Sequence, residues 1–366
     1  MNQFRPFEHE HEICKRHWQG QRLAVADLLR GLAAVCIVWH HLSLYAPQSD
    51  LADLVAPSVG YVLFNHFCYA VAVFFVLGGL IASIDKGTRT FGATLQEILK
   101  RYLRLAIPYL VMLAVLLAVN FVATSNGWSL NQIESFSWPQ LLAHVFFLQD
   151  LFGYGNFSAG TWYLCVELQW SCFVLLLGYL AKRWSSDKID PVQYQVAILF
   201  PLGIASAWYW SRSETWEAYF LFFAAQYVLG VLLGFKLQGR LPSWFFFLYC
   251  SAIAGSLVIN PRPQLMVSLL VAGILYYSPS WVQDLKLPSL FAWLSEISYS
   301  LFLVHYLING LVLKLIDPWA RQSPSWAVAA MVVAFACSLL AADAFHRFVE
   351  TPAIRWLKRW SWAKRV

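Results

Sequence analysis

The chain has 366 residues, of which 59% are hydrophobic and only 13% are charged, and its mean hydropathy is +0.55. A soluble domain is usually about 45–50% apolar and about 25% charged. The composition therefore excludes a large soluble core and predicts an integral membrane protein. Its Phe, Trp and Tyr side chains, 17% of the total, suit the two membrane interfaces.

Ten apolar segments are long enough to cross a bilayer as helices. Their predicted bounds are 24–45, 61–84, 102–124, 160–183, 193–211, 217–236, 243–260, 264–280, 291–315 and 325–348. The expected fold is therefore all-α, a polytopic membrane protein with about ten transmembrane helices. We expect three regions along the chain: a cytoplasmic N-terminal segment (1–22), a membrane domain (23–350) and a basic cytoplasmic tail (351–366).

The placement of the basic residues is more informative than the net charge of +6. If the N-terminus lies inside, 21 of the 26 Lys and Arg residues fall on the inner side of the predicted spans. The positive-inside rule then places both termini in the cytoplasm.

The seven cysteines are scattered, mostly within apolar segments, and show no CxxC or Cys/His metal spacing. Such cysteines usually behave as small buried hydrophobes. We therefore expect no metal site. We also expect no nucleic-acid partner, and the sequence leaves the oligomeric state open.

The first predicted span contains DLLRGLAAVCIVWHHL (27–42), an apolar helix with an unusual set of polar residues. At about 100° per residue, Arg30 and His41 differ by only about 20° around the axis and by about 16 Å along it, whereas His40 points about 80° away. Asp27 is an i,i+3 neighbour of Arg30. Asp27, Arg30 and His41 therefore form one polar stripe, with the arginine near the cytoplasmic end.

This stripe has two interpretations. Arg30 could extend to the inner interface and pair with Asp27, while His41 is a hydrogen-bonded histidine of the helix bundle. Alternatively, because a central arginine costs about 2.5–3.5 kcal/mol on insertion scales, the stripe could face a polar shaft. Burial disfavours the charged imidazolium and would leave His41 neutral and able to accept a proton.

Further ionisable residues follow along the chain. Lys100, Arg101 and Arg104 lie at the cytoplasmic start of the third span, where they could bind phosphates or simply mark an inner membrane edge. The segment WPQLLAHVFFLQDLF (138–152) is too short to span the bilayer and predicts an interfacial or re-entrant helix. Glu167 lies one to two turns inside the outer end of the fourth span, where a carboxylate is expensive unless it faces a cavity.

The last two predicted spans also carry polar residues. Ser298, Tyr299 and His305 lie on the span at 291–315, where hydroxyl groups are often interhelical hydrogen-bond partners rather than site residues. His346, Arg347 and Glu350 end the final span, and a helix-end ion cluster that packs the bundle is the favoured interpretation for them.

Arg30 and His41, separated by ten residues in the setting DLLRGLAAV…HH, resemble the signature of the acyltransferase-3 family of integral membrane O-acyltransferases. Five further segments resemble motifs of that family in the same order along the chain. They are AVFFVLGGLIAS (72–83), KRYLRLAIPYL (100–110), TWYLCVELQW (161–170), ISYSLFLVHYLI (297–308) and RFVETP (347–352). Together they cover almost the entire chain.

The resemblance implies transfer of an acetyl or other short acyl group from cytosolic acyl-CoA, with acetyl-CoA as donor. The acceptor would be a hydroxyl group of an extracytoplasmic glycan or a small hydroxylated molecule, at the bacterial inner membrane. His41 is the expected general base, and a covalent acyl-histidine is the alternative. The other expected roles are donor binding by Arg30, Lys100, Arg101 and Arg104, a catalytic part for Arg30 and Glu167, and support from Asp27, Ser298, Tyr299 and His305.

Other functions fit parts of the pattern. A proton-coupled transporter or flippase could use Asp27, His41 and Glu167 as a proton relay, although no internal repeat is visible in the sequence. A scaffold membrane subunit gives no reason for an aligned Arg–His stripe. Within the family, transfer of a succinyl or longer acyl group is the enzymatic alternative.

Overall fold

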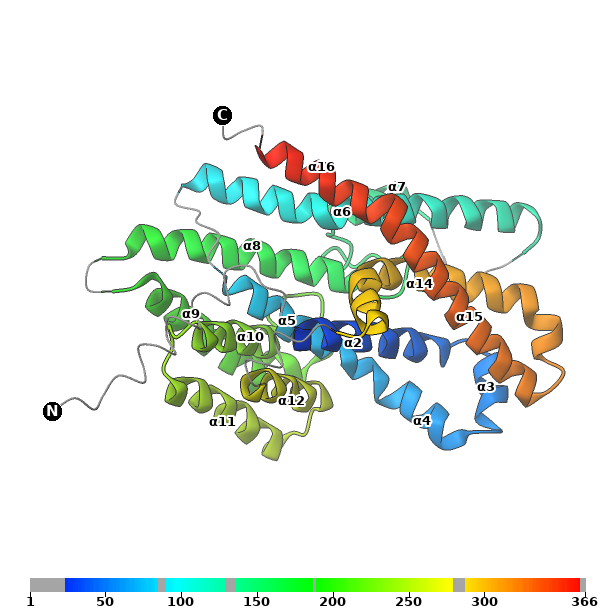
Figure 1. Ribbon diagram of the computed structural model, residues 1–366, viewed down its shortest axis with the longest axis horizontal. Helices are drawn as coiled ribbons and strands as arrows, with labels where there is room; N and C mark the ends of the chain where they lie inside the picture. Colours follow the sequence, from blue (N-terminus) through cyan, green and yellow to red (C-terminus); the bar gives the residue numbers. More distant parts are fainter. Residues whose placement is uncertain (1–23, 85–89, 129–135, 187–188, 279–286, 363–366) are drawn as a thin grey trace. The chain divides into compact units, whose positions relative to one another are not determined.

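A computed structural model describes residues 24–84, 90–128, 136–186, 189–278 and 287–362 (Figure 1). Within these ranges every regular element is a helix, apart from an isolated bridge between Ser186 and Ile189, which confirms the predicted all-α class. The chain forms two compact units. The first comprises Met1–Arg30, Val71–Glu97 and Gln169–Pro288, and the second comprises Gly31–Ala70, Ile98–Leu168 and Ser289–Val366.

Within the described residues, six helical segments are long and apolar enough to cross a membrane, as an integral membrane protein requires. They are Ala24–Leu42 (α2), Pro57–Ala82 (α4 to α5), Phe91–Ser125 (α6), Thr161–Trp184 (α8), Ser289–Ala320 (α14) and Pro324–Arg359 (α15 into α16). Four shorter helices coincide with the remaining predicted spans. They are α9 (Pro191–Trp208), α10 (Ala224–Leu237), α11 (Ser243–Ile259) and α12 (Pro263–Tyr277).

Two helical segments differ from their predicted bounds: one is interrupted and the other starts earlier. The segment predicted over 61–84 is interrupted: α4 (Pro57–Asn65) ends before His66, and a short 3-10 turn, η1 (Phe67–Ala70), leads into α5 (Val71–Ala82). α6 begins at Phe91 rather than near residue 102. Its polar first turns are stabilised by Thr90, whose Oγ1 accepts a hydrogen bond from the backbone N–H of Ala93 (3.2 Å).

The start of α10 also differs, because the residues before it are held in turns. Gln169 donates through Nε2 to the carbonyl of Ala218 (2.9 Å) and accepts through Oε1 from the N–H of Phe220 (3.0 Å). These bonds satisfy the backbone outside a helix, so α10 starts at Ala224 rather than near residue 217.

In the first unit, α5 and α10 pack closely because glycines let their backbones meet. A side-chain carbon at Gly230 would collide with the carbonyl of Val76, and one at Gly79 would collide with the carbonyl of Tyr227. Small residues at such contacts are typical of helix pairs in membranes. α10 is buried from Ala224 to Phe235 and forms the centre of this unit.

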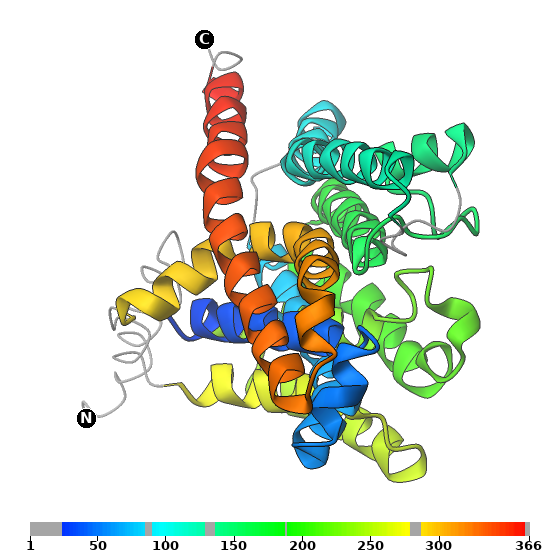
Figure 2. The same cartoon turned by 90° about the vertical axis from the view of Figure 1, so that its right-hand side faces the viewer.

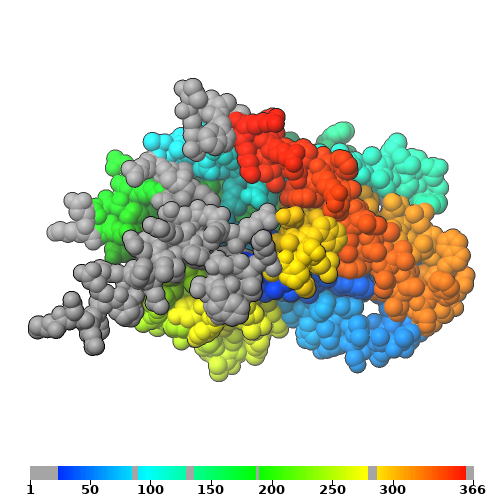
Figure 3. Space-filling view, in the orientation of Figure 1, coloured from blue at the N-terminus to red at the C-terminus, as the bar shows by residue number. Residues whose placement is uncertain are grey.

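In the second unit, α14 and α15 (Pro324–Phe345) lie side by side, and α3 (Gln48–Asp53) lies against α15 (Figures 1 and 2). α15 continues through one π-helical turn, η4 (His346–Glu350), into α16 (Thr351–Trp362). This stretch lies on the surface seen in Figure 3, in orange and red. Large apolar side chains along it are exposed, among them Leu340 (70%), Phe348 (79%) and Trp356 (53%). Lipid, rather than water, is the environment that suits such a surface.

We expect the Gly230→Ala variant to unfold at a lower temperature than the unaltered protein. The added methyl group would clash with the α5 backbone, and overpacking usually costs about 1–3 kcal/mol. Thermal unfolding in detergent micelles, followed by circular dichroism, measures the change. Gly273→Ala in α12 is the matched control, because nothing lies within 4 Å of an added carbon there. A midpoint for Gly230→Ala at or above that of the control would contradict the close α5–α10 contact.

Candidate active site

His41 and His305 lie against each other in the second unit, one on α2 and the other on α14. Their ring centroids are 5.1 Å apart, with an angle of 35° between the ring planes. His305 is completely buried, and its Nδ1 lies 2.9 Å from the carbonyl oxygen of Leu301. The turn after α2 is tied to the same part of α14, because the Tyr45 hydroxyl donates to the carbonyl of Tyr306 (3.0 Å).

The neighbouring histidine, His40, contacts a different element. Its Nδ1 lies 3.2 Å from the carbonyl oxygen of Leu63 in α4, and the edge of its ring approaches Phe64. The two adjacent histidines therefore face different helices, as the helical period of the sequence predicts. Only His41 of the pair meets His305.

Asp27 and Arg30 form the ion pair that their i,i+3 spacing predicts. Arg30 Nη1 lies 3.3 Å from Asp27 Oδ1, and the two side chains are 31% and 15% exposed. On the continuous helix α2, Arg30 precedes His41 by eleven residues, or about 16 Å along the axis. α2 is therefore uninterrupted between the two residues, as the predicted stripe requires.

Glu167 lies near the start of α8, buried at 7% exposure, and its partners are Arg101 and Tyr163. Arg101 Nη1 is 3.8 Å from Glu167 Oε1, and the Tyr163 hydroxyl donates to Oε2 (3.5 Å). Because α6 begins at Phe91, Arg101 lies about 15 Å along that helix. Arg101, which is expected to bind the donor, and Glu167, which is expected to have a catalytic part, are therefore paired.

An aromatic pair connects these two groups of residues. The Phe302 ring lies 6.5 Å from His305 and 5.8 Å from Tyr163, centroid to centroid. Gly160 (φ 89°) presses its backbone against Phe302, and a side-chain carbon there would lie 2.8 Å from the ring. The loop before α8 is thus fixed against α14, and the second unit brings His41, His305, Glu167 and Arg101 into one connected cluster.

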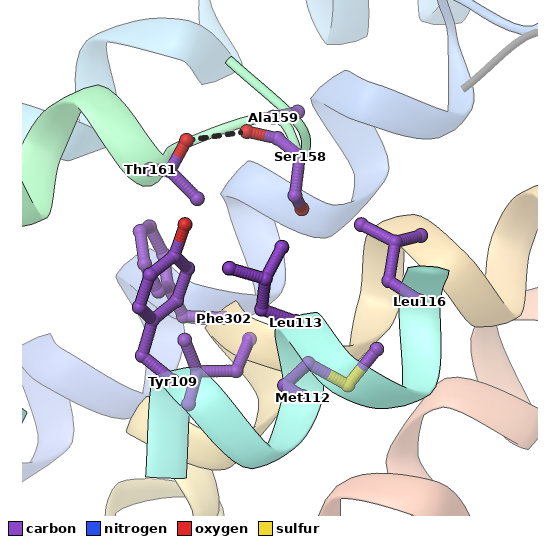
Figure 4. A pocket seen from close by; sticks show the side chains of 9 residues that line it. Tyr109, Met112, Leu113, Leu116, Ser158, Ala159, Thr161 and Phe302 are labelled. Atoms are coloured by element: carbon purple, nitrogen blue, oxygen red, sulfur yellow. Dashed lines mark hydrogen bonds between the residues drawn. The ribbon is translucent and has the colours of Figure 1, made fainter. Parts of the chain in front are cut away.

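A small pocket lies on the α6 side of Phe302 (Figure 4). Tyr109 and three apolar residues of α6 line it together with Ser158 and Thr161, where the Thr161 hydroxyl donates to the Ser158 carbonyl (2.9 Å). The pocket has room for about one water molecule. It is too small to be the binding site of an acyl chain.

The other predicted site residues, Ser298, Tyr299, Lys100 and Arg104, lie on α14 and α6. Ser298 donates to the carbonyl of Ser295 (2.8 Å), and Tyr299 donates to the carbonyl of Leu105 on α6 (2.8 Å). The Ser298 bond lies within α14, and the Tyr299 bond joins α14 to α6. Both hydroxyl groups therefore serve packing within the bundle, as one interpretation of the sequence expects. Lys100 and Arg104 lie on α6 beside Arg101, and Arg104 is exposed.

The helix-end cluster at the end of α15 is also observed. Glu350 Oε2 accepts from Ser300 (2.6 Å) and lies 3.0 Å from His346 Nδ1. His346 and Glu350 belong to the last helical stretch and Ser300 to α14, so the cluster packs the helices of the second unit together. Arg347, also expected in this cluster, pairs instead with Asp343 of α15 (2.8 Å). Among the described residues, no group of three or more His, Cys, Asp or Glu side chains could hold a metal ion.

One buried polar group was missed by sequence reasoning. His144, on the short helix α7 (Trp138–Val145), is completely buried and binds Tyr109 Oη through Nδ1 (2.7 Å) and the Gly155 carbonyl through Nε2 (3.1 Å). A carbonyl only accepts, so Nε2 carries the proton and Nδ1 accepts from Tyr109. Burial lowers the pKa of His144, which favours this neutral state. The interaction anchors the loop after α7 to α6.

A family model described as an acyltransferase domain, Acyl_transf_3, matches residues 24–343. The matched range runs from the start of α2 almost to the end of α15 and contains every residue of the cluster around His41. Neither a curated protein nor a solved structure matches the chain.

The contact between Arg101 and Glu167 predicts a coupled effect on stability. Arg101→Leu should lower the unfolding midpoint, because it leaves a buried carboxylate without its cation. Adding Glu167→Gln should restore part of the loss, giving a coupling of roughly 0.5–3 kcal/mol. Thermal unfolding of the two single variants and the double variant measures this coupling. Purely additive changes would show that the two side chains do not interact.

Proposed function

Because the chain belongs to the acyltransferase-3 family, we propose that it transfers an acetyl or other short acyl group from cytosolic acyl-CoA to a hydroxyl group of an extracytoplasmic glycan or related acceptor. The family and the apolar helices together make it a membrane acyltransferase. The observation that supports a histidine base for this reaction is the contact between His41 and His305, an imidazole pair inside the helix bundle.

His41 acts as the general base in this proposal. Its unprotonated nitrogen takes the proton of the acceptor hydroxyl while the oxygen attacks the thioester carbonyl of acetyl-CoA. The tetrahedral intermediate then collapses, the C–S bond breaks, and the CoA thiolate takes the proton from the His41 imidazolium. The products are the acetyl ester and CoA with a free thiol, so atoms and charges balance.

The donor approaches from the cytoplasmic side. Arg30, on the His41 stripe but about 16 Å nearer the N-terminus of α2, would bind the pantetheine arm or a CoA phosphate, with Asp27 fixing its orientation. Lys100, Arg101 and Arg104 add positive charge for a polyanionic ligand. Because Arg101 also pairs with Glu167, donor binding and the Glu167 carboxylate would be coupled.

This orientation rests on a topology of ten spans with both termini in the cytoplasm, in a bacterial inner membrane. The positive-inside distribution of Lys and Arg supports it. The acyl group would then cross the membrane within the protein, and His41 lies where donor and acceptor meet. Acetyl is favoured over succinyl or longer groups only by the family resemblance.

The role of His41 is tested by two neighbouring substitutions. We expect His41→Ala to abolish acetylation of the surface glycan, since loss of a general base typically costs about 10²–10⁴-fold in rate. His40→Ala is the matched control and should retain acetylation, because His40 contacts α4. Mass spectrometry of surface glycans from cells expressing each variant, and from cells lacking the gene, identifies acceptor and acyl group together. Full acetylation by an inserted His41→Ala protein would rule out the assignment.

Arg30 is tested by donor binding. Removing a charged hydrogen-bonding partner should weaken acetyl-CoA binding about 10- to 100-fold, measured by calorimetry on the purified Arg30→Ala variant. Arg240→Ala is the control, because Arg240 pairs with Asp190 in the first unit (3.7 Å) and lies outside the α2 stripe. Equal affinities for the two variants would remove Arg30 from the donor site.

A further inference from the structure

We propose that His305 is a positioning residue for His41: its Nε2 accepts a hydrogen bond from the His41 ring and thereby sets which nitrogen of His41 faces the substrate. The inference rests on the proposed function of His41 as general base.

The carbonyl of Leu301 determines the tautomer of His305. A carbonyl oxygen can only accept a hydrogen bond, so the 2.9 Å contact requires the proton on His305 Nδ1. In a neutral imidazole the other nitrogen, Nε2, is then an acceptor with a free lone pair. That atom is buried and has no hydrogen-bond partner among the described residues.

A buried acceptor without a partner costs free energy. The neighbouring group that can donate a hydrogen bond to it is a ring N–H of His41. Two imidazole rings joined by an N–H···N bond of about 2.9 Å have centroids about 5 Å apart. The observed centroid distance of 5.1 Å meets that requirement. The bond is not formed in the structure, and the proposal requires the His41 ring to turn an N–H toward His305 Nε2.

Another buried polar atom nearby is oriented differently. Asn309 Nδ2, one helical turn beyond His305, also has no hydrogen-bond partner among the described residues. Its amide oxygen, however, accepts from Ser338 on α15 (2.8 Å), which turns the Asn309 side chain toward that helix. Of these two atoms, His305 Nε2 is the one whose ring lies against the proposed general base, His41.

The resulting chain of donors and acceptors gives His305 a defined task. His305 Nδ1–H donates to Leu301, and His305 Nε2 accepts from one N–H of His41. The other nitrogen of His41 is then unprotonated and takes the proton of the acceptor hydroxyl. The His41 imidazolium keeps its hydrogen bond to His305 Nε2, so no second proton moves, and the charge is stabilised as the orienting group of a catalytic triad stabilises its histidine.

Activity measurements on purified protein test this role. His305→Phe keeps a ring of similar size but removes the acceptor, and we expect kcat for acetyl-CoA consumption to fall about 100-fold or more while KM for acetyl-CoA is unchanged. His305→Gln retains an acceptor oxygen and should recover at least tenfold of that loss. His40→Phe is the control and should keep the kcat of the unaltered protein. A His305→Phe protein with unchanged kcat, or a His305→Gln protein as slow as His305→Phe, would overturn the proposal.

A second measurement does not depend on activity. Nitrogen-15 NMR of histidine-labelled protein in micelles, with signals assigned through the His41→Phe and His305→Phe variants, reports which ring nitrogens carry protons. The proposal predicts Nδ1–H for His305 and a shift of the His41 nitrogen signals when His305 is replaced. An Nε2–H tautomer, or His41 signals unaffected by the replacement, would overturn it. If the unaltered protein consumed no acetyl-CoA, the proposed function would fail while this measurement still decided the histidine contact.

Discussion

A bilayer offers no water to a polar side chain, and the placement of the ionisable groups in this chain follows from that constraint. Arg30 is paired with Asp27, and Glu167 with Arg101 and Tyr163. Each of these contacts lies within one unit and joins residues of one helix or of two packed helices. The groups that could not otherwise be tolerated in hydrocarbon are therefore held in fixed positions.

His305 is the informative exception to this pairing. It is completely buried, one of its nitrogens is satisfied by its own helix, and the other is not satisfied by any described residue. This open acceptor lies beside the His41 ring, which is the group proposed to donate a hydrogen bond to it. The aromatic contact through Phe302 and Tyr163 then joins this open position to the Glu167–Arg101 pair.

Sequence reasoning predicted the features that depend on one helix alone. The 3.6-residue period separated His40 from His41 and brought Asp27 to Arg30, and both results are confirmed because α2 is an uninterrupted helix. It also predicted the all-α class and the positions of most helices, because long apolar segments leave few alternatives in a membrane.

Features that depend on contacts between helices could not be predicted in this way. No spacing within the sequence indicates that Arg101 meets Glu167, or that His305 meets His41, because each pair joins helices that are far apart in the chain. The start of α10 and the break at His66 were missed for a related reason. Hydropathy averages over a window and does not detect the side chains, such as Gln169, that hold the backbone outside a helix.

In the proposed mechanism, donor and acceptor meet at His41 from opposite sides of the membrane. The most direct measurement uses purified protein in sealed liposomes, with acetyl-CoA supplied at the face that carries the N-terminus and oligosaccharide from the host's surface glycan enclosed at the other. The proposed mechanism predicts acetylated oligosaccharide on one side and free CoA on the other, and neither in liposomes carrying His41→Ala. Solute uptake without CoA release, or acetylation that requires both substrates on the same side, would contradict it.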